Sequence, residues 1–258
     1  MDIFHFNEIE MLAFLLVLVR VSVFFAMWPV FGVFAVPAFA KILTSLLVSI
    51  LLFPTVAWKE LGETLSSNMI IIMVVREVFV GLILVYIGRL LFFAVNICGQ
   101  LVSMSLGLSS SEIYNPTMDS RASSIEQFQM MIASLVFLAW SGHHIFIKAM
   151  TESFTIIPLS STFINSVSPE TIANLVQQVM TVGIQLSGPV MAAIFFMNVA
   201  LGLVGRAVPQ INILITSLSA NIAMGLLIVL ISIPAFIFGF KYFVNVSGIN
   251  LFAVLKTI

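Results

Sequence analysis

Two long stretches without a charged residue constrain this chain more than any other feature of its sequence. They run from 171 to 205 and from 207 to 240, with only Arg206 between them. A membrane-spanning helix needs about 20 apolar residues, so each stretch exceeds what one crossing requires. We therefore expect helices that are broken or tilted, or that are buried against other protein as well as lipid.

The remaining sequence has the same character. Of the 258 residues, 61% are hydrophobic and only 8% are charged, which is too few charges to cover a soluble domain. Apolar runs typical of helices, and none typical of strands, occur at 11–38, 42–58, 69–98, 128–150, 172–204 and 211–240. We predict an all-α fold of kinked hydrophobic hairpins that occupies 1–258 as one domain.

Charge and cysteine content exclude several classes of function. Ten Lys and Arg against eleven Asp and Glu give a net charge of -1, and the cations are scattered singly, so nucleic acid is not expected as a partner. Cys98 has no second thiol in the chain, which excludes an internal disulfide framework. The start, MDIFHFNEIEM, has no Lys or Arg, so we expect no cleaved signal peptide.

No constellation typical of catalysis is found. His143 and His144 are adjacent, so on a helix they point about 100° apart and do not suit one metal ion. We interpret them as part of a structural polar turn after Trp140–Ser141–Gly142. The serines of LGLSSSE lie in no GxSxG elbow. We predict no enzymatic activity, no cofactor and no metal.

Ionisable residues inside the apolar runs need an explanation, because each costs about 2.5 to 3.5 kcal/mol at a bilayer centre. They are Arg20, Arg76, Glu77 and Arg89. A proton or ion relay, as in a transporter, is one interpretation. The other is structural, either an interhelical pair or a side chain that reaches the membrane interface near the end of a span, and we favour it because the runs hold too few carboxylates for a relay.

Neutral polar residues form a stripe on the fifth run. They are Asn174, Gln178, Thr181 and Gln185, whose spacings of four, three and four place them on one helical face. Such side chains need polar partners, so the stripe faces either a partner subunit or a water-filled lumen, and both remain open. Further along the same run, Gly188 and Pro189 predict a helix kink.

Small residues and one long polar stretch mark the middle of the chain. Gly99, Ser103 and Gly107 recur at every fourth residue and predict close approach of a neighbouring helix. The polar stretch runs from Leu106 to Gln127. From the residues alone it is a solvated connecting loop or a segment that lines or plugs a path, and the former is favoured.

Three motifs resemble a known family. They are GQLVSMSLGLSSSEIYNP, FLAWSGHHIFIKAMTESFTIIPL and MNVALGLVGRAVPQINILITS. Together they are similar to the FliR family of flagellar export-gate proteins and its type III secretion counterparts, over most of the chain. Arg206, Pro209 and Gln210 stand where the third motif would place its turn. The chain departs from the family pattern at Gln100, Asn115 and Leu218–Ser219.

The resemblance implies a non-enzymatic membrane subunit. It would assemble with FliP-like and FliQ-like subunits, with an FlhB-like subunit docked on it, and pass unfolded flagellar proteins across the bacterial inner membrane at the flagellar basal body. Residues 1–170 would be a FliP-like portion. Residues 171–258 would be a FliQ-like hairpin and tail, turning at Arg206, Pro209 and Gln210.

The resemblance also implies that the loop between the middle helices closes the pore. The corresponding plug residues are Leu106, Gly107, Leu108, Ser109, Ser110, Ser111, Glu112, Tyr114, Asn115, Pro116 and Met118. Flexible side chains such as Met104, Met118 and Leu106 could seal the path. Two alternatives stay open: a virulence-type secretion gate and, with less support, a small-solute transporter, which broken helices and intramembrane arginines would also allow.

Overall fold

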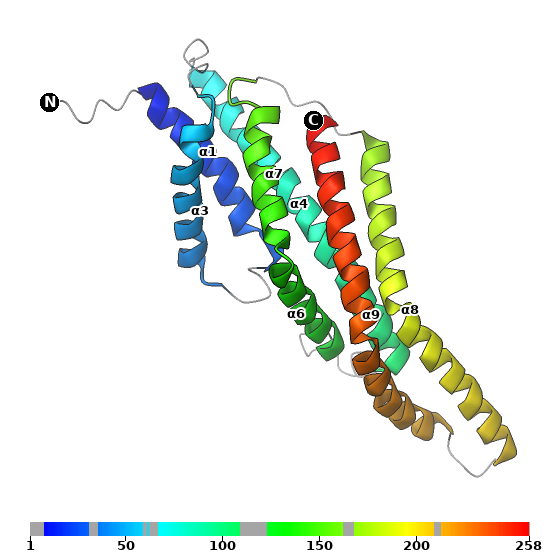
Figure 1. Cartoon of the computed structure of the whole chain (residues 1–258). Helices are drawn as coiled ribbons and strands as arrows, with labels where there is room; N and C mark the ends of the chain where they lie inside the picture. Colours follow the sequence, from blue (N-terminus) through cyan, green and yellow to red (C-terminus); the bar gives the residue numbers. More distant parts are fainter. Residues whose placement is uncertain are drawn as a thin grey trace. The chain divides into compact units, whose positions relative to one another are not determined.

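The computed structural model describes residues 8–30, 36–58, 61, 67–108, 123–161, 168–208 and 213–257. Within these ranges the chain is helical and has no strand, so the all-α prediction is confirmed. The elements in chain order (Figure 1) are α1 (Glu8–Ala26), α3 (Ala38–Leu52), the short 3-10 helix η1 (Phe53–Thr55), α4 (Ser67–Leu106), α6 (Ser124–Ala139), α7 (Gly142–Ile156), α8 (Pro169–Ala207) and α9 (Ile213–Thr257).

The helices are shared between two compact units. The first unit comprises Met1–Leu90, Ser141–Ala173 and Asn245–Ile258, and the second comprises Leu91–Trp140 and Asn174–Val244. Long helices therefore contribute to both. The predicted division at residue 170 is a different partition, and it remains a prediction.

Glycine lets α1 approach α4 closely in the first unit. A side chain at Gly81 would place its Cβ 2.9 Å from the carbonyl oxygen of Arg20, so only glycine fits without a shift. Two turns further along α4, Gly88 makes room for Phe146. The ring of Phe146 contacts that of Trp28 edge-on, with 5.0 Å between the centroids. Close backbone approach and aromatic packing together form this core.

The second unit is built in the same way around the end of α4. A Cβ at Gly99 would lie 2.7 Å from Cα of Glu126 on α6, which confirms the predicted close approach at Gly99. Phe92, Phe137 and Phe240 bring α4, α6 and α9 together through ring contacts at 5.5 and 6.2 Å. Lys241 lies over the ring of Trp140 at 3.2 Å and adds a cation–π contact between α9 and the end of α6.

Several predicted boundaries are wrong. The run 11–38 is not one helix: α1 ends at Ala26, and α3 begins at Ala38. The predicted end of the first run, at 38, is instead the start of α3, because Pro37 is the N-cap of that helix, a position that needs no backbone donor.

The run 128–150 is likewise two helices, α6 and α7. They are separated at Trp140–Ser141, where Ser141 has φ 56°. The predicted turn therefore lies earlier than expected, at Trp140–Ser141, and His143 and His144 belong to α7. At the other end of the chain, α9 continues past the predicted end at 240 to Thr257, since Lys241 ends the apolar run without ending the helix.

Among the residues that the structure describes, five helices are long and apolar enough to cross a membrane. They are α1, α3 with η1, α4, α8 and α9, and a sixth crossing results if α6 and α7 count as one broken span. Their burial differs: 44% of the most apolar window of α4 and 39% of that of α1 are buried inside the chain, compared with 11% in α3, 17% in α8 and 17% in α9. The chain is thus an all-α membrane protein in which α3 and the last two helices are poorly covered by its own residues.

Candidate functional site: an ionic cluster, an anchored loop and an uncovered hairpin

A buried ionic cluster joins α1 to α4 in the first unit. The Arg20 Nε atom donates to Glu77 Oε2 at 2.5 Å, and the Arg76 Nη2 atom donates to Glu77 Oε1 at 2.6 Å. The three side chains are 0%, 4% and 0% exposed in the order Arg20, Arg76, Glu77. Of the two structural interpretations left open by the sequence, Arg20, Arg76 and Glu77 follow the interhelical pair, whereas Arg89 is exposed.

The cluster has one more positive charge than negative. Backbone carbonyl oxygens at and just after the end of α7 accept hydrogen bonds from its two arginines. Arg20 donates to the carbonyl oxygen of Ile157 at 3.1 Å, and Arg76 donates to that of Leu159 at 2.8 Å. Carbonyls at a helix C-terminus lack intrahelical partners and carry partial negative charge. Ile157 is the C-cap of α7, so Arg20 stabilises that helix end, whereas Arg76 holds the turn that follows it at Leu159.

Hydroxyl and aromatic groups complete the cluster. Ser153 and Ser161 accept hydrogen bonds from Arg20 and Arg76, each at 3.1 Å, and Arg20 stacks 4.1 Å from the ring centroid of Phe154. One carboxylate held between two guanidinium groups cannot pass a proton along a chain of carboxylates. The arrangement suits a structural tie between α1, α4 and α7.

No metal centre is found in the described ranges, where no group of three or more His, Cys, Asp and Glu side chains could hold an ion. His143 and His144 lie in the first turn of α7 with ring centroids 4.2 Å apart. The predicted absence of catalysis and cofactors stays a prediction.

The helix α4 ends where the predicted plug begins. Gly107 has φ +79°, its N–H donates to the Met104 carbonyl at 3.0 Å, and the Leu108 N–H donates to the Ser103 carbonyl at 3.1 Å. These two bonds and the left-handed glycine make a Schellman motif, which satisfies carbonyls of the last turn. Glycine after an apolar run is a signal for a helix end, but the sequence prediction used Gly107 only for close helix approach and as a plug residue.

Packing fixes the first residue of the loop to the α8–α9 hairpin. Leu106 is buried, and its side chain occupies the space where a Cβ at Gly225 of α9 would be. Ile194 of α8 borders the same spot, 3.1 Å from that Cβ position. Met104, by contrast, is 66% exposed. Sequence reasoning assigned Leu106 to sealing and missed that it anchors the loop.

The other end of the loop is fixed by a helix cap. The Ser123 hydroxyl accepts a hydrogen bond from the Ile125 N–H at 3.3 Å at the start of α6. Both ends thus belong to the second unit. The predicted plug residues between them lie outside the described residues: Ser109, Ser110, Ser111, Glu112, Tyr114, Asn115, Pro116 and Met118.

One side of α8 changes character along its length. In its first half the predicted polar stripe is mostly open, with Asn174, Thr181 and Gln185 exposed and Gln178 half-buried. Past Pro189 the same helical side carries large apolar residues instead, and Phe196 is 70% exposed. The polar half is the part that a partner or a lumen must meet.

The predicted kink and hairpin turn both lie on this hairpin. Gly188 and Pro189 fall inside α8, which continues as a helix through them and changes direction along its length (Figure 1). Arg206 is exposed in the last turn of α8, where a cation interacts favourably with the helix C-terminus. Pro209 and Gln210 lie outside the described residues.

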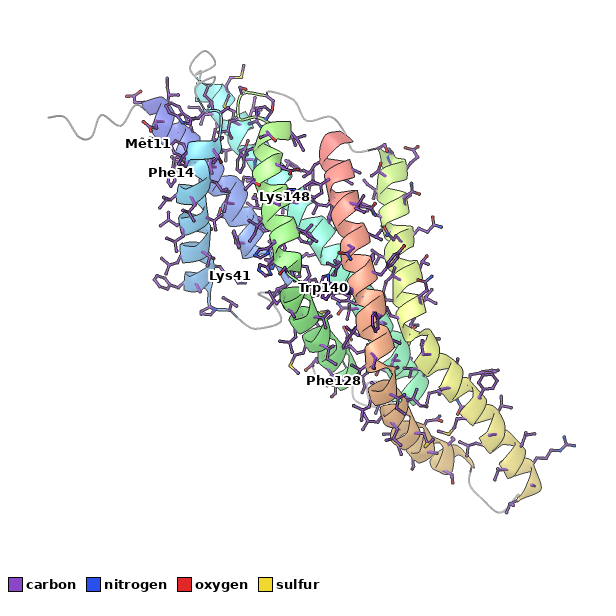
Figure 2. All side chains as sticks on the ribbon, viewed as in Figure 1. Met11, Phe14, Lys41, Phe128, Trp140 and Lys148 are labelled. Carbon is purple, nitrogen blue, oxygen red and sulfur yellow. The ribbon has the colours of Figure 1, made fainter. Side chains whose placement is uncertain are left out.

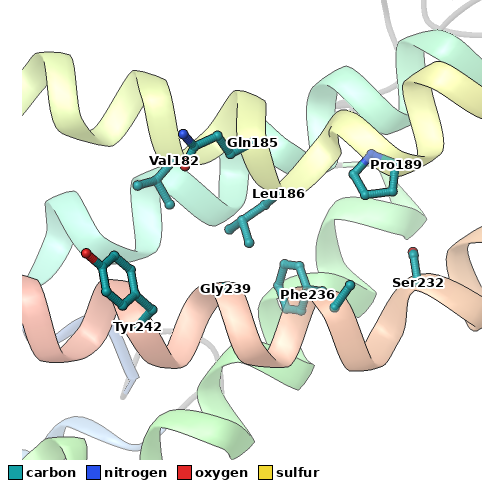
Figure 3. Close-up of a pocket in the computed structure, with 9 residues that line it drawn as sticks. Val182, Gln185, Leu186, Pro189, Ser232, Phe236, Gly239 and Tyr242 are labelled. Atoms are coloured by element: carbon teal, nitrogen blue, oxygen red, sulfur yellow. The ribbon is translucent and has the colours of Figure 1, made fainter.

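A cavity of about 170 Å³ opens between α8 and α9 beside Pro189 (Figure 3). Its lining is mainly apolar, with three polar side chains at its margin. The residues are Val182, Gln185, Leu186, Pro189, Ser232, Ala235, Phe236, Gly239 and Tyr242.

These features define a class: an all-α membrane protein that is tied internally by buried charges, carries a loop anchored between helices, and leaves its last hairpin uncovered. The sequence model for "Bacterial export proteins, family 1" matches residues 11–246. The chain therefore belongs to this family of bacterial export proteins, and the family resemblance of its motifs is confirmed.

Curated relatives cover most of the chain. It is 30% identical over 222 residues to the flagellar biosynthetic protein FliR of Bacillus subtilis, a match that covers 85% of each chain. The corresponding protein of Caulobacter vibrioides is 28% identical over 219 residues, 84% of this chain and 87% of the relative. That of Aquifex aeolicus is 26% identical over 230 residues, 88% of each. The family thus links the chain to flagellar biogenesis and protein export.

Proposed function

We propose that this chain is a subunit of the flagellar type III export gate. With FliP-like and FliQ-like subunits it forms a conduit for unfolded flagellar proteins across the bacterial inner membrane at the basal body, and an FlhB-like subunit docks on it. The support is its family and the flagellar names of its curated relatives. Those names favour the flagellar system over a virulence-type gate.

The observation that carries the proposal is the uncovered length of the α8–α9 hairpin. The two helices have 39 and 45 residues, so at 1.5 Å per residue they are about 58 and 67 Å long. The hydrocarbon core of a bilayer is about 30 Å thick, and even a tilt of about 40° would leave more than 40 Å of each helix along the membrane normal. Lipid cannot cover the whole hairpin.

Large apolar side chains nevertheless stand exposed over most of that length. Ile231 and Phe238 on α9 are 79% and 72% exposed, and Leu203 and Phe196 on α8 are similarly open. Figure 2 draws such side chains projecting along both helices. Exposed apolar surface on this scale indicates a protein interface, so partner subunits must cover what the bilayer does not.

The loop between α4 and α6 is the proposed gate. Its two ends are held by Leu106 packed at Gly225 and by the cap at Ser123, so the segment between them can act from a rigid frame. Exposed Met104 is available at its base for sealing around a threaded chain.

Co-purification tests the proposal most simply. A tagged chain extracted in mild detergent from a strain that lacks the native copy should bring down the FliP-like and FliQ-like subunits and restore swimming. A chain that purifies alone, and that carries a small solute into vesicles, would contradict the proposal and support a transporter.

A further inference from the structure

The cavity beside Pro189 has the dimensions of a single large side chain. Its volume is about 170 Å³, and an apolar cavity of about 150 Å³ is known to hold one benzene ring. It lies between two helices that leave most of their surface uncovered. A cavity of this kind on an interface is where a partner's anchoring side chain is expected.

Two of the lining residues, Gly239 on α9 and Pro189 on α8, have special backbone properties. Gly239 lets α9 approach Leu186 of α8 so closely that a Cβ there would lie 2.7 Å from the Leu186 Cδ2 atom. Pro189 has no backbone N–H, and Phe236 is a buried part of the wall. The interior of the cavity therefore has a mainly apolar wall.

The margin of the cavity decides what kind of molecule covers it. Gln185 on α8 is exposed and makes no hydrogen bond to another described residue, and Tyr242 on α9 is 72% exposed (Figure 3). An amide left without a partner in hydrocarbon costs several kcal/mol. A lipid acyl chain cannot satisfy it, whereas a protein helix with polar side chains can.

We infer that this cavity receives a large apolar side chain from a helix of a partner gate subunit, and that the same helix carries a hydrogen-bonding side chain about one turn away that pairs with Gln185. Gln185 and Pro189 are four residues apart, so the polar and apolar contacts lie one turn apart on α8. The inference rests on the proposed function and names the chemistry of its partner contact.

Substituting Gln185 distinguishes protein from lipid by the direction of the effect. If a partner helix pairs with the amide, Gln185→Leu lowers recovery of the partner subunit by about threefold, the usual weight of an interhelical hydrogen bond in a membrane protein. If lipid faces the amide, the same change leaves recovery equal or raises it. Gln177→Leu is the matched control, an exposed glutamine two turns away whose loss should change nothing.

A photo-reactive amino acid at Ala235 identifies the occupant directly. The expected product is a covalent adduct with one gate subunit, and the same probe at Leu230, on the far side of α9, should not give it. Adducts with lipid alone from position 235, or equal recovery after Gln185→Leu, would overturn the inference while the unmodified chain still brings down its partners. Failure of the unmodified chain to bring them down would contradict the proposed function instead.

Discussion

The ionic cluster and the α8–α9 hairpin differ in where their side chains find partners. In the cluster, Arg20, Arg76 and Glu77 are buried, and each has partners within the chain. In the hairpin, apolar side chains such as Phe196 and polar ones such as Gln185 are exposed. The charges of the cluster are therefore satisfied within the chain, whereas the exposed side chains of the hairpin depend on what surrounds them. Four changes test this contrast, ordered from the largest expected effect to the smallest.

Removing the carboxylate of the cluster should have the largest effect. Glu77→Ala leaves two buried guanidinium groups without their counter-charge, which should cost about 3 to 5 kcal/mol of folding stability. The measurement is the yield and the thermal unfolding of the purified chain. Glu152→Ala is the control, because the Glu152 pair with Lys148 is 3.7 Å long and 42% and 69% exposed, and an exposed pair contributes at most about 1 kcal/mol. Equal losses would contradict the structural role of the buried cluster.

Filling the anchor of the loop should have the next largest effect. Gly225→Val places atoms where Leu106 lies, so it should displace the base of the loop at a cost of about 1 to 3 kcal/mol and raise ion leakage through the membrane. Gly202→Val is the control, since nothing lies within 4 Å of its Cβ position.

A double variant sharpens this test. If the clash is with Leu106, Leu106→Ala should partly relieve Gly225→Ala, so that the two changes together cost less than their sum. If the stability costs of the two changes simply add, Leu106 does not pack against Gly225.

Changing the helix end at the loop should have a smaller effect. Gly107 has φ +79°, so Gly107→Ala should cost about 1 kcal/mol and loosen the start of the loop, whereas Gly107→Asn should cost less because asparagine tolerates this conformation. Proteolysis rates near residue 108 in detergent provide the measurement. Equal rates for both variants would show that the Schellman motif does not hold this end.

The smallest effect is expected at the tip of the hairpin. Arg206 is exposed, so its interaction with the end of α8 contributes about 0.3 to 1 kcal/mol. Arg206→Ala should lower motility modestly through the turn or its partner contact, and Arg206→Lys should restore it. Normal swimming of the alanine variant would remove Arg206 from the functional residues.

The sequence predicted the presence of the helices far better than the residues at which they begin and end. Apolar runs identified every span, but 11–38 and 128–150 are each interrupted, because hydropathy does not register a change of direction at Ser141 or the start of a helix after Pro37. A charged residue ends an apolar run but need not end a helix. The predicted end at 240 was therefore too early, and α9 continues past Lys241 to Thr257.

The candidate site was predictable only in part. The pairing of Arg20 with Glu77 follows from the cost of burying charge, but their sequence separation of 57 residues gives no geometry. Three features depend on three-dimensional packing: the hydrogen bonds of Arg20 and Arg76 to the end of α7 and the turn after it, the anchor of Leu106 on Gly225, and the cavity at Pro189. No local pattern could have revealed them.

Partner-dependent burial of the hairpin is measured most directly by thiol labelling. Cys98 is the only cysteine and is buried, so a variant with Phe196→Cys carries one accessible thiol. We predict that a maleimide labels it rapidly in the solubilised chain expressed alone and slowly in the complex extracted with FliP-like and FliQ-like subunits. Equally rapid labelling in a complex that still exports flagellar proteins would contradict the account.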